Sequence, residues 1–188
     1  MLERVLIAGS GGQGILLIGR ILAQGGMSGV PHVTYFPAYG AEVRGGTSNC
    51  QIVLSSEEIH SPVPDQFEAM LILNQESAIR FIPRRTDNTR VILNTSLCEA
   101  PDAGPVSAIR ATDIANDLGD IRVANFVMMG AYLASNDCVP AEALEDCIRN
   151  ELSGKPKALI DLNIKALEIG MNHREVRTAE HSNSRTTK

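Results

Sequence analysis

The sequence predicts an α/β fold, a single three-layer, Rossmann-like domain built on a doubly wound and mostly parallel sheet. Short apolar runs typical of strands alternate with longer segments of helical periodicity. The first apolar run ends in a glycine-rich turn that leads directly into an apolar helical segment. The length of 188 residues suits one well-buried domain and is short for two.

The first half of the chain is expected to supply four strands. Residues 3–8 form the first, and a helix over 12–28 follows it and ends at Gly29. A short strand at 33–36 and a strand with apolar–polar alternation at 47–55 come next. The latter follows a loop with no intervening helix, which breaks the alternation and is compatible with antiparallel pairing. Residues 69–73 form a compact interior strand, and a short helix over 78–82 stops at Pro83.

The second half is expected to complete the sheet and to supply most of the helices. Strands are predicted at 91–94 and 106–109, and Thr112 and Asp113 are expected to cap a short helix that reaches Leu118. The remaining expected helices cover 125–135, which is apolar nearly all round, 140–152 and 156–169. We therefore expect one domain over residues 1–170 and a polar, flexible C-terminal tail over 171–188.

Composition narrows the possible classes of function. A net charge of −5 argues against a nucleic-acid-binding protein, which would need a basic surface. No apolar run is long enough to span a bilayer, so no membrane partner is expected. The chain enters a strand almost at once after Met1, without a signal-peptide pattern, and a cytoplasmic location is the expectation.

Neither the cysteines nor the histidines show metal-ligand spacing. Cys50, Cys98, Cys138 and Cys147 form no CxxC pair, so neither a zinc ribbon nor an iron–sulfur site is expected, and most of them should be core residues. Cys50 is the possible exception, because it lies close to an unusual loop. The four histidines fall in turns or in the tail, and no catalytic acid–base arrangement is evident.

The stretch Gly9-Ser10-Gly11-Gly12-Gln13-Gly14 is the most informative part of the chain. Glycines let backbone approach a phosphate closely, and the following helix N-terminus supplies unpaired N–H groups and a positive dipole end. All six residues are therefore candidates for binding a diphosphate or another anion. The alternative is a tight strand-to-helix turn whose glycines serve packing alone.

The spacing matches the dinucleotide fingerprint GxGxxG, but its second half is missing. An acidic residue should end the next strand and hold a ribose hydroxyl, whereas this region reads Thr34-Tyr35-Phe36-Pro37. An NAD site is therefore doubtful. No Lys-Ser/Thr pair follows the glycines, which excludes a P-loop for ATP.

A second constellation follows the strand at 33–36. Tyr39, Glu42 and Arg44 place a phenol, a carboxylate and a guanidinium close together, and Gly45 and Gly46 follow them. In a doubly wound sheet this loop leaves the same edge as the glycine turn. Arg44 could bind a phosphate in bidentate fashion or pair with Glu42 to fix the loop. The plainer alternative is a solvated loop with an ordinary surface ion pair.

Together the two loops resemble the gamma subunit of the 2-oxoacid:ferredoxin (or flavodoxin) oxidoreductases. The likeness rests on residues 9–14, on 39–46 and on Thr47-Ser48-Asn49-Cys50 with Ile59-His60-Ser61-Pro62, and it spans about residues 3–170. The family usually has proline where this chain has Ala41, a change expected to affect loop stiffness more than chemistry. Within the family, residues 44–50 with Ser61-Pro62 look closest to the 2-oxoglutarate type.

The resemblance implies a Rossmann-like domain that contributes to coenzyme A binding and to assembly of the enzyme complex. Coenzyme A would be a co-substrate bound at the two loops, and thiamine diphosphate, Mg²⁺ and iron–sulfur clusters would reside in partner subunits. The implied partners are alpha and beta subunits, with or without a delta subunit, and ferredoxin or flavodoxin as the electron acceptor. No catalytic residue is assigned to this chain, which alone should be inactive.

Other readings stay open at this point. Pyruvate, branched-chain 2-oxoacid and indolepyruvate enzymes are alternatives within the family. Outside it, the chain could be a stand-alone NAD(P)-dependent dehydrogenase or a non-catalytic scaffold whose glycine turn contacts a partner chain.

Overall fold

The computed structural model describes residues 1–38, 47–101, 104–173 and 176–177. Its strands are β1 (Leu2–Ser10), β2 (His32–Ala38), β3 (Thr47–Ser55), β4 (Ala69–Ile72), β5 (Arg90–Asn94), β6 (Val106–Ile109) and β7 (Val176–Arg177). Its α-helices are α1 (Ile15–Gly26), α2 (Gln75–Phe81), α3 (Ala111–Asp117), α4 (Ala124–Leu133), α5 (Ala141–Glu151) and α6 (Lys157–Met171). Two 3₁₀ turns, η1 (Ile82–Arg84) and η2 (Ile121–Val123), complete the described elements.

The described strands form one mixed sheet in the order β2-β3-β1-β4-β5-β6-β7. β1, β4, β5 and β6 run parallel to one another. β3 lies antiparallel between β1 and β2, so β2 points the same way as β1. The β1–β3 ladder extends from Leu2–Ser55 to Ser10–Thr47. The strand at 47–55 therefore pairs antiparallel, because a loop and not a helix returns the chain to the sheet.

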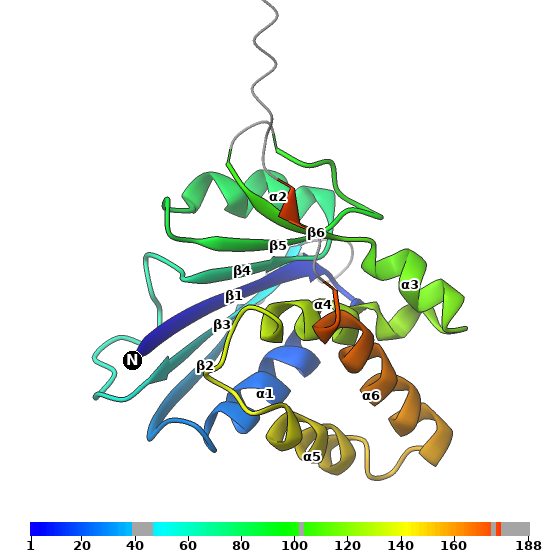
Figure 1. The fold of residues 1–188 in the computed structure, drawn as a ribbon. Helices are drawn as coiled ribbons and strands as arrows, with labels where there is room; N and C mark the ends of the chain where they lie inside the picture. Colours follow the sequence, from blue (N-terminus) through cyan, green and yellow to red (C-terminus); the bar gives the residue numbers. More distant parts are fainter. Residues whose placement is uncertain (39–46, 102–103, 174–175, 178–188) are drawn as a thin grey trace, which may run out of the picture.

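The sheet is the middle of three layers, and the two outer layers are unequal (Figure 1). One face is covered by α1, α3, α4, α5 and α6, and its core includes residues of β2 and β3 such as Tyr35 and Ile52. The other face is covered by α2, and the core on this side is formed by α2 with residues of β1, β4, β5, β6 and the segments beside them. The three-layer α/β prediction is thus confirmed, and one half of the second face lies beyond the reach of α2.

The element order matches the prediction, and the differences have local causes. The first helix begins at Ile15 and not at residue 12, because residues 11–14 form the turn that precedes it. α2 begins at Gln75, three residues before the predicted start, because Asn74 Oδ1 accepts a hydrogen bond from the Ser77 N–H and caps the helix. In the region of the expected tail, α6 runs on to Met171, and Val176 and Arg177 pair with β6.

The predicted cap of α3 is wrong. Arg110 is the N-cap residue and its side chain does not cap the helix, whereas Asn94 Oδ1 and Ser96 Oγ accept hydrogen bonds from the N–H groups of Thr112 (3.4 Å) and Asp113 (3.1 Å). Thr112 is buried in the first turn, where its hydroxyl accepts a hydrogen bond from Asn94 Nδ2 (2.9 Å). The Asp113 carboxylate pairs with Arg110 instead. Tertiary contacts therefore use both side chains that the local pattern had assigned to capping.

The helix pair α4–α6 closes the larger core and depends on two facing glycines. A Cβ at Gly130 would lie 2.0 Å from the Leu167 carbonyl oxygen, and a Cβ at Gly170 would lie 2.1 Å from the Val127 carbonyl oxygen. Both obstacles are backbone atoms, which cannot rotate away. The two helices approach closely because neither residue carries a side chain. No described helix is both long and apolar enough to traverse a lipid bilayer.

We predict that Gly130→Ala lowers the free energy of unfolding by about 2–3 kcal/mol and Tm by roughly 5–10 °C, because the methyl group forces α4 and α6 apart. Chemical and thermal unfolding followed by circular dichroism measure both quantities. Gly154→Ala is the matched control, since a Cβ there meets nothing within 4 Å. Equal stability of the two variants would contradict the close α4–α6 approach.

Candidate functional site

The glycine turn lies where the connections of the sheet change direction. From β1 the chain turns to α1 on one face, whereas from the adjacent parallel strand β4 it turns to α2 on the other face. The carboxyl ends of β1 and β4 therefore lie at a topological switch point, between two oppositely directed connections (Figure 1). Open α/β sheets bind ligands outside the carboxyl ends of their strands at such switch points. Their position makes Ser10 to Gly14 and Asn74 the candidate site.

Two side chains fix the shape of this turn, one from the turn itself and one from the residue that precedes α2. Gln13 folds back so that its Oε1 accepts a hydrogen bond from the Ser10 N–H at 2.7 Å, and the Gln13 N–H donates to the Ser10 carbonyl at 3.2 Å. Asn74, after β4, donates from Nδ2 to the Ser10 hydroxyl at 2.5 Å. The last contact joins the carboxyl ends of β1 and β4 directly. The turn is thus held in one conformation by its own glutamine and by the neighbouring strand.

The four glycines have different reasons to be glycine. A Cβ at Gly9 would lie 2.6 Å from Gln13 Oε1, and one at Gly14 would lie 2.2 Å from Asn125 Nδ2. Gly14 and Gly12 also have positive φ values of 72° and 90°. Gly11 has neither constraint, because its φ is not positive and its Cβ would meet nothing within 4 Å. Packing or a left-handed backbone conformation therefore explains Gly9, Gly12 and Gly14, whereas Gly11 faces open space.

The start of α1 supplies hydrogen-bond donors at this place. Gly14 is the N-cap residue, and no side chain caps the helix. Because the first amides of an α-helix have no intrahelical acceptor, the N–H groups of Ile15, Leu16 and Leu17 lie at the positive end of the helix dipole without an acceptor within α1. The Gly14 carbonyl, in contrast, accepts from Ile18 N–H and from Asn125 Nδ2. The turn thus places donors at the carboxyl edge of the sheet, whereas the Gly14 carbonyl is bonded within the domain.

The structure adds three residues that the sequence pattern did not single out. Asn74 bridges β4 to the turn, and Asn125 anchors Gly14 to the start of α4. Arg80 of α2 donates from Nη1 to the Thr47 hydroxyl at 2.6 Å, and Thr47 is the ladder partner of Ser10. A guanidinium therefore lies one strand away from the turn. The only sequence signal for any of them was the polar Asn74 after an apolar run.

The position where a dinucleotide fold holds its ribose-binding acid differs here in two ways: another strand occupies it, and the end of β2 carries no acidic residue. In a dinucleotide fold the strand beside β1 is the second parallel strand, whose end holds that acid. Here the antiparallel β3 takes that position, and β2 lies one strand further out. β2 also ends in Phe36-Pro37-Ala38. Both the strand order and the residue types disfavour an NAD site.

The other candidate residues are either core residues or outside the described part of the chain. Cys50 is buried, its thiol faces the Ile15 carbonyl, and burial raises its pKa to about 12, so it is a core residue and not a reactive exception. Tyr39, Glu42, Arg44, Gly45 and Gly46 lie outside the described residues. Among the described ranges, no group of three or more His, Cys, Asp or Glu side chains is placed to hold a metal ion.

Residues 4–173 match the family model described as pyruvate ferredoxin/flavodoxin oxidoreductase. The ketoisovalerate oxidoreductase subunit VorA of Methanothermobacter thermautotrophicus is 39% identical over 170 residues. That match covers 89% of this chain and 35% of VorA. The chain therefore spans about a third of the length of this curated relative.

Two solved structures share the fold. The gamma subunit of a keto/oxoacid ferredoxin oxidoreductase from Geobacter sulfurreducens superposes with a TM-score of 0.71 and 29% identity, over 92% of this chain and 96% of that one. The 2-oxoglutarate:ferredoxin oxidoreductase of Magnetococcus marinus gives a TM-score of 0.82 at 23% identity, over 90% of this chain and 30% of that one. The second match concerns the fold alone.

We predict that alanine lowers stability at Gly14 of the turn and leaves it nearly unchanged at Gly11. Gly14→Ala should lower the free energy of unfolding by more than about 1–2 kcal/mol, since a left-handed conformation and the Asn125 amide both oppose a methyl group. Gly11→Ala should stay within about 0.5 kcal/mol of the wild type. Urea unfolding of both variants measures the difference. A destabilised Gly11→Ala variant would show that Gly11 serves packing after all.

Proposed function

The chain belongs to the pyruvate ferredoxin/flavodoxin oxidoreductase family, and we propose that it acts as the gamma-type unit of a 2-oxoacid:ferredoxin oxidoreductase. In this role it binds coenzyme A and joins the assembly, while the thiamine chemistry takes place on other chains. The observation that carries the proposal is the turn at the switch point, which is rigid and rich in donors yet leaves Gly11 open. An anion of the size of a diphosphate fits this chemistry.

Coenzyme A suits the site better than NAD does. Both carry a diphosphate, but only NAD depends on a ribose-binding carboxylate at the strand beside β1, a position that antiparallel β3 occupies here. The Magnetococcus marinus fold neighbour was crystallised with 2-oxoglutarate, coenzyme A and succinyl-CoA. Arg80 provides a cation near the turn, and Arg44, which lies outside the described residues, is the second guanidinium proposed to contact phosphate.

This chain's residues would bind and orient the acyl acceptor. The amides of α1 and the glycine turn would hold the diphosphate, so that the thiol end extends toward a centre on a partner chain. Tyr39, Glu42, Gly45 and Gly46 are proposed as the other wall of the same site. Thiamine diphosphate, Mg²⁺ and iron–sulfur clusters would be held by alpha and beta subunits, with or without a delta subunit, and electrons would pass to ferredoxin or flavodoxin.

Two 2-oxoacids are candidates for the substrate. We favour 2-oxoglutarate, oxidised with coenzyme A to succinyl-CoA and CO₂, because of the sequence at residues 44–50 and Ser61-Pro62. The 39% identity with the ketoisovalerate oxidoreductase subunit favours a branched-chain 2-oxoacid as the second candidate. The substrate side chain would be selected by the thiamine-bearing chains, so both candidates share the role proposed for this one.

Reconstitution tests the proposed function. The chain alone should not reduce ferredoxin or a viologen dye with any 2-oxoacid and coenzyme A, whereas coexpression with the alpha and beta chains of the same organism should give an active complex. Coenzyme A-dependent dye reduction measured with 2-oxoglutarate, 3-methyl-2-oxobutanoate, pyruvate and indolepyruvate then identifies the substrate. Activity of the isolated chain, or an active alpha–beta complex that gains nothing from this chain, would contradict the proposal.

We predict that Gly11→Ala raises the Kd of the assembled enzyme for coenzyme A about tenfold, equivalent to ~1.4 kcal/mol, because the methyl group occupies the space open to the diphosphate. Calorimetric titration of coenzyme A into the complex measures this Kd. Gly154→Ala, at an exposed site with equally open surroundings, is the control and should bind like the wild type. An unchanged Kd in the Gly11 variant would remove the turn from the binding site.

A further inference from the structure

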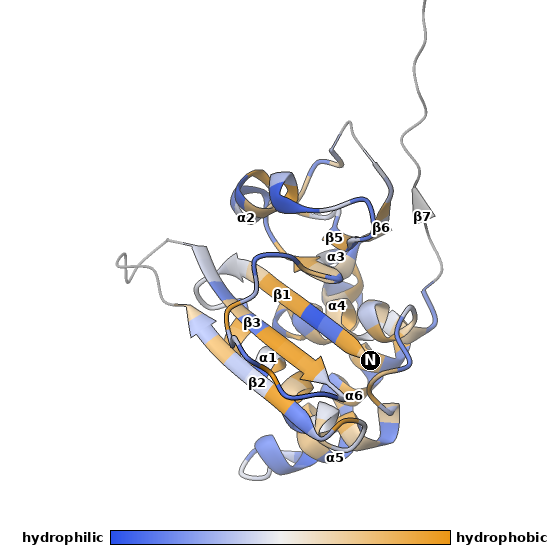
Figure 2. Ribbon diagram, turned by 90° about the vertical axis from the view of Figure 1, so that its left-hand side faces the viewer, coloured by the Kyte–Doolittle hydropathy of each residue, from blue (hydrophilic) through white to orange (hydrophobic). Residues whose placement is uncertain are grey.

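Half of one sheet face has no covering helix among the described residues. α2 packs on β1 and β4, and its core cluster includes no residue of β2 or β3. On this face the β1–β3–β2 ladders align Leu2, Arg4 and Leu6 with residues of the two outer strands, among them Val53 and Phe36. Figure 2 looks onto these strands, and no helix lies in front of β2 and β3. The β3 residues of this face, among them Val53 and Ser55, are themselves buried, so its exposed part lies at Leu2, at Phe36 and on the segment that follows β3. We name this helix-free surface the open half-sheet.

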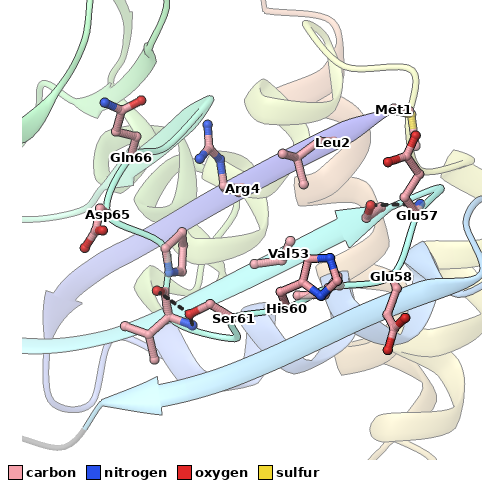
Figure 3. Close-up of a pocket in the computed structure, with 14 residues that line it drawn as sticks. Met1, Leu2, Arg4, Val53, Glu57, Glu58, His60, Ser61, Asp65 and Gln66 are labelled. Carbon is pink, nitrogen blue, oxygen red and sulfur yellow. Dashed lines mark hydrogen bonds between the residues drawn. The ribbon is translucent and has the colours of Figure 1, made fainter.

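The segment between β3 and β4 crosses the open half-sheet and is anchored at its start (Figure 3). The Glu57 N–H donates to Ser55 Oγ at 3.0 Å, and the Ser56 N–H donates to the Met1 carbonyl at 2.9 Å. Within the segment, Ser61 Oγ donates to the Val63 carbonyl at 3.1 Å. We call residues 57–66 the strap. Together with β1 and β3 the strap lines a solvent-open hollow of about 620 Å³.

Large apolar side chains that face solvent gather around this hollow. Met1 is 54% exposed, Leu2 50% and Val63 43%, and all three line it. Phe36 of β2, 41% exposed, lies on the same face of the sheet, where it is the ladder partner of Gln51 in β3. These four are half of the large apolar side chains that are exposed in the described part of the chain. Such a concentration marks an interaction surface more often than a random scatter does.

The charge around the hollow is acidic. Glu57, Glu58 and Asp65 of the strap are exposed. Arg4, a cation of the hollow, is already paired with Glu68 in a bidentate contact. Burial alone would raise the pKa of Glu68, but the hydrogen bonds from Arg4 outweigh it and lower that pKa, so the pair stays ionised and neutral overall. The lining also contains His60, exposed on the strap, and the Met1 ammonium, which donates to Ser56 Oγ at 2.6 Å, so carboxylates still outnumber the unpaired cations.

This charge pattern decides between two kinds of occupant. In a two-fold dimer of this chain the same surface would meet itself, which brings two surfaces of the same acidic charge together. Like charges opposed in this way disfavour association. A different chain with an apolar centre and a Lys- or Arg-rich margin would complement both the apolar side chains and the acidic strap. The surface therefore suits a heterologous partner.

We propose that the open half-sheet, with the strap 57–66, is the surface through which this chain docks onto another subunit of the oxidoreductase, one that presents apolar side chains within a basic rim. The inference rests on the proposed function, since it takes the partner from that assembly. It also gives a role to Ile59-His60-Ser61-Pro62, which forms the middle of the strap and which the coenzyme A site leaves unused. Docking and ligand binding thus occupy opposite ends of β1.

Two variants and a control test the proposal in the coexpressed complex with the alpha and beta chains. Val63→Asp introduces a carboxylate into the apolar centre, and Glu57→Lys/Glu58→Lys reverses the strap charge. Ile121→Asp, at an apolar residue 55% exposed in η2, is the matched control. Circular dichroism melts of each isolated variant should match the wild type, since all substituted side chains are exposed. Both strap variants should weaken assembly at least about tenfold, measured by titration calorimetry, whereas Ile121→Asp should not.

The outcomes separate the two proposals. Failure of the wild-type chain to assemble with alpha and beta chains would overturn the proposed function. Normal assembly of the wild type and of both strap variants would overturn the docking surface alone. A wild-type chain that forms dimers by analytical ultracentrifugation, and loses them in Val63→Asp, would show that a second copy occupies this face and would also overturn the inference.

Discussion

The antiparallel strand β3, inserted between β1 and β2, is the constraint on which the rest of the structure depends. Its ladder runs the whole length of β1, from Leu2–Ser55 to Ser10–Thr47. It places Ala38 and Thr47, the residues that flank the second sequence motif, at the edge of the sheet where the glycine turn lies. It also widens the sheet by two strands beyond the area that α2 covers. One pairing thus shapes both the proposed ligand site and the proposed docking face.

The two ends of β1 consequently have different chemistry. At its carboxyl end, Ser10 and Gln13 build a polar turn that is tied to β4 through Asn74 and offers the amides of α1 to an anion. At its amino end, Leu2 and the strap present apolar and acidic groups. A domain arranged in this way can hold a co-substrate at one edge while a neighbouring subunit fixes its position from the other. This division of roles fits the proposed function, in which the chain binds a co-substrate for chemistry on partner chains.

Local sequence patterns were sufficient for the elements and for the place of the turn. Alternation gave the strand 47–55 with the bounds found in the structure, and the strand–glycine–helix order gave the turn at residues 9–14. Contacts between distant residues were not accessible in the same way. Arg80 reaches Thr47 across 33 positions, and Asn125 reaches Gly14 across 111. The cap of α3 failed for the same reason, because Thr112 is committed to Asn94.

Amide hydrogen exchange on the assembled enzyme, with and without coenzyme A, examines the proposed role of the glycine turn at the level of single segments. Ligand bound by the turn should slow exchange at the amides from Gly11 to Leu17, above all at Ile15, Leu16 and Leu17, which have no intrahelical acceptor at the start of α1. The segment 57–66 should show the same exchange in both states, since it lies at the other end of β1. Slowed exchange elsewhere with no change between Gly11 and Leu17 would contradict coenzyme A binding at this turn.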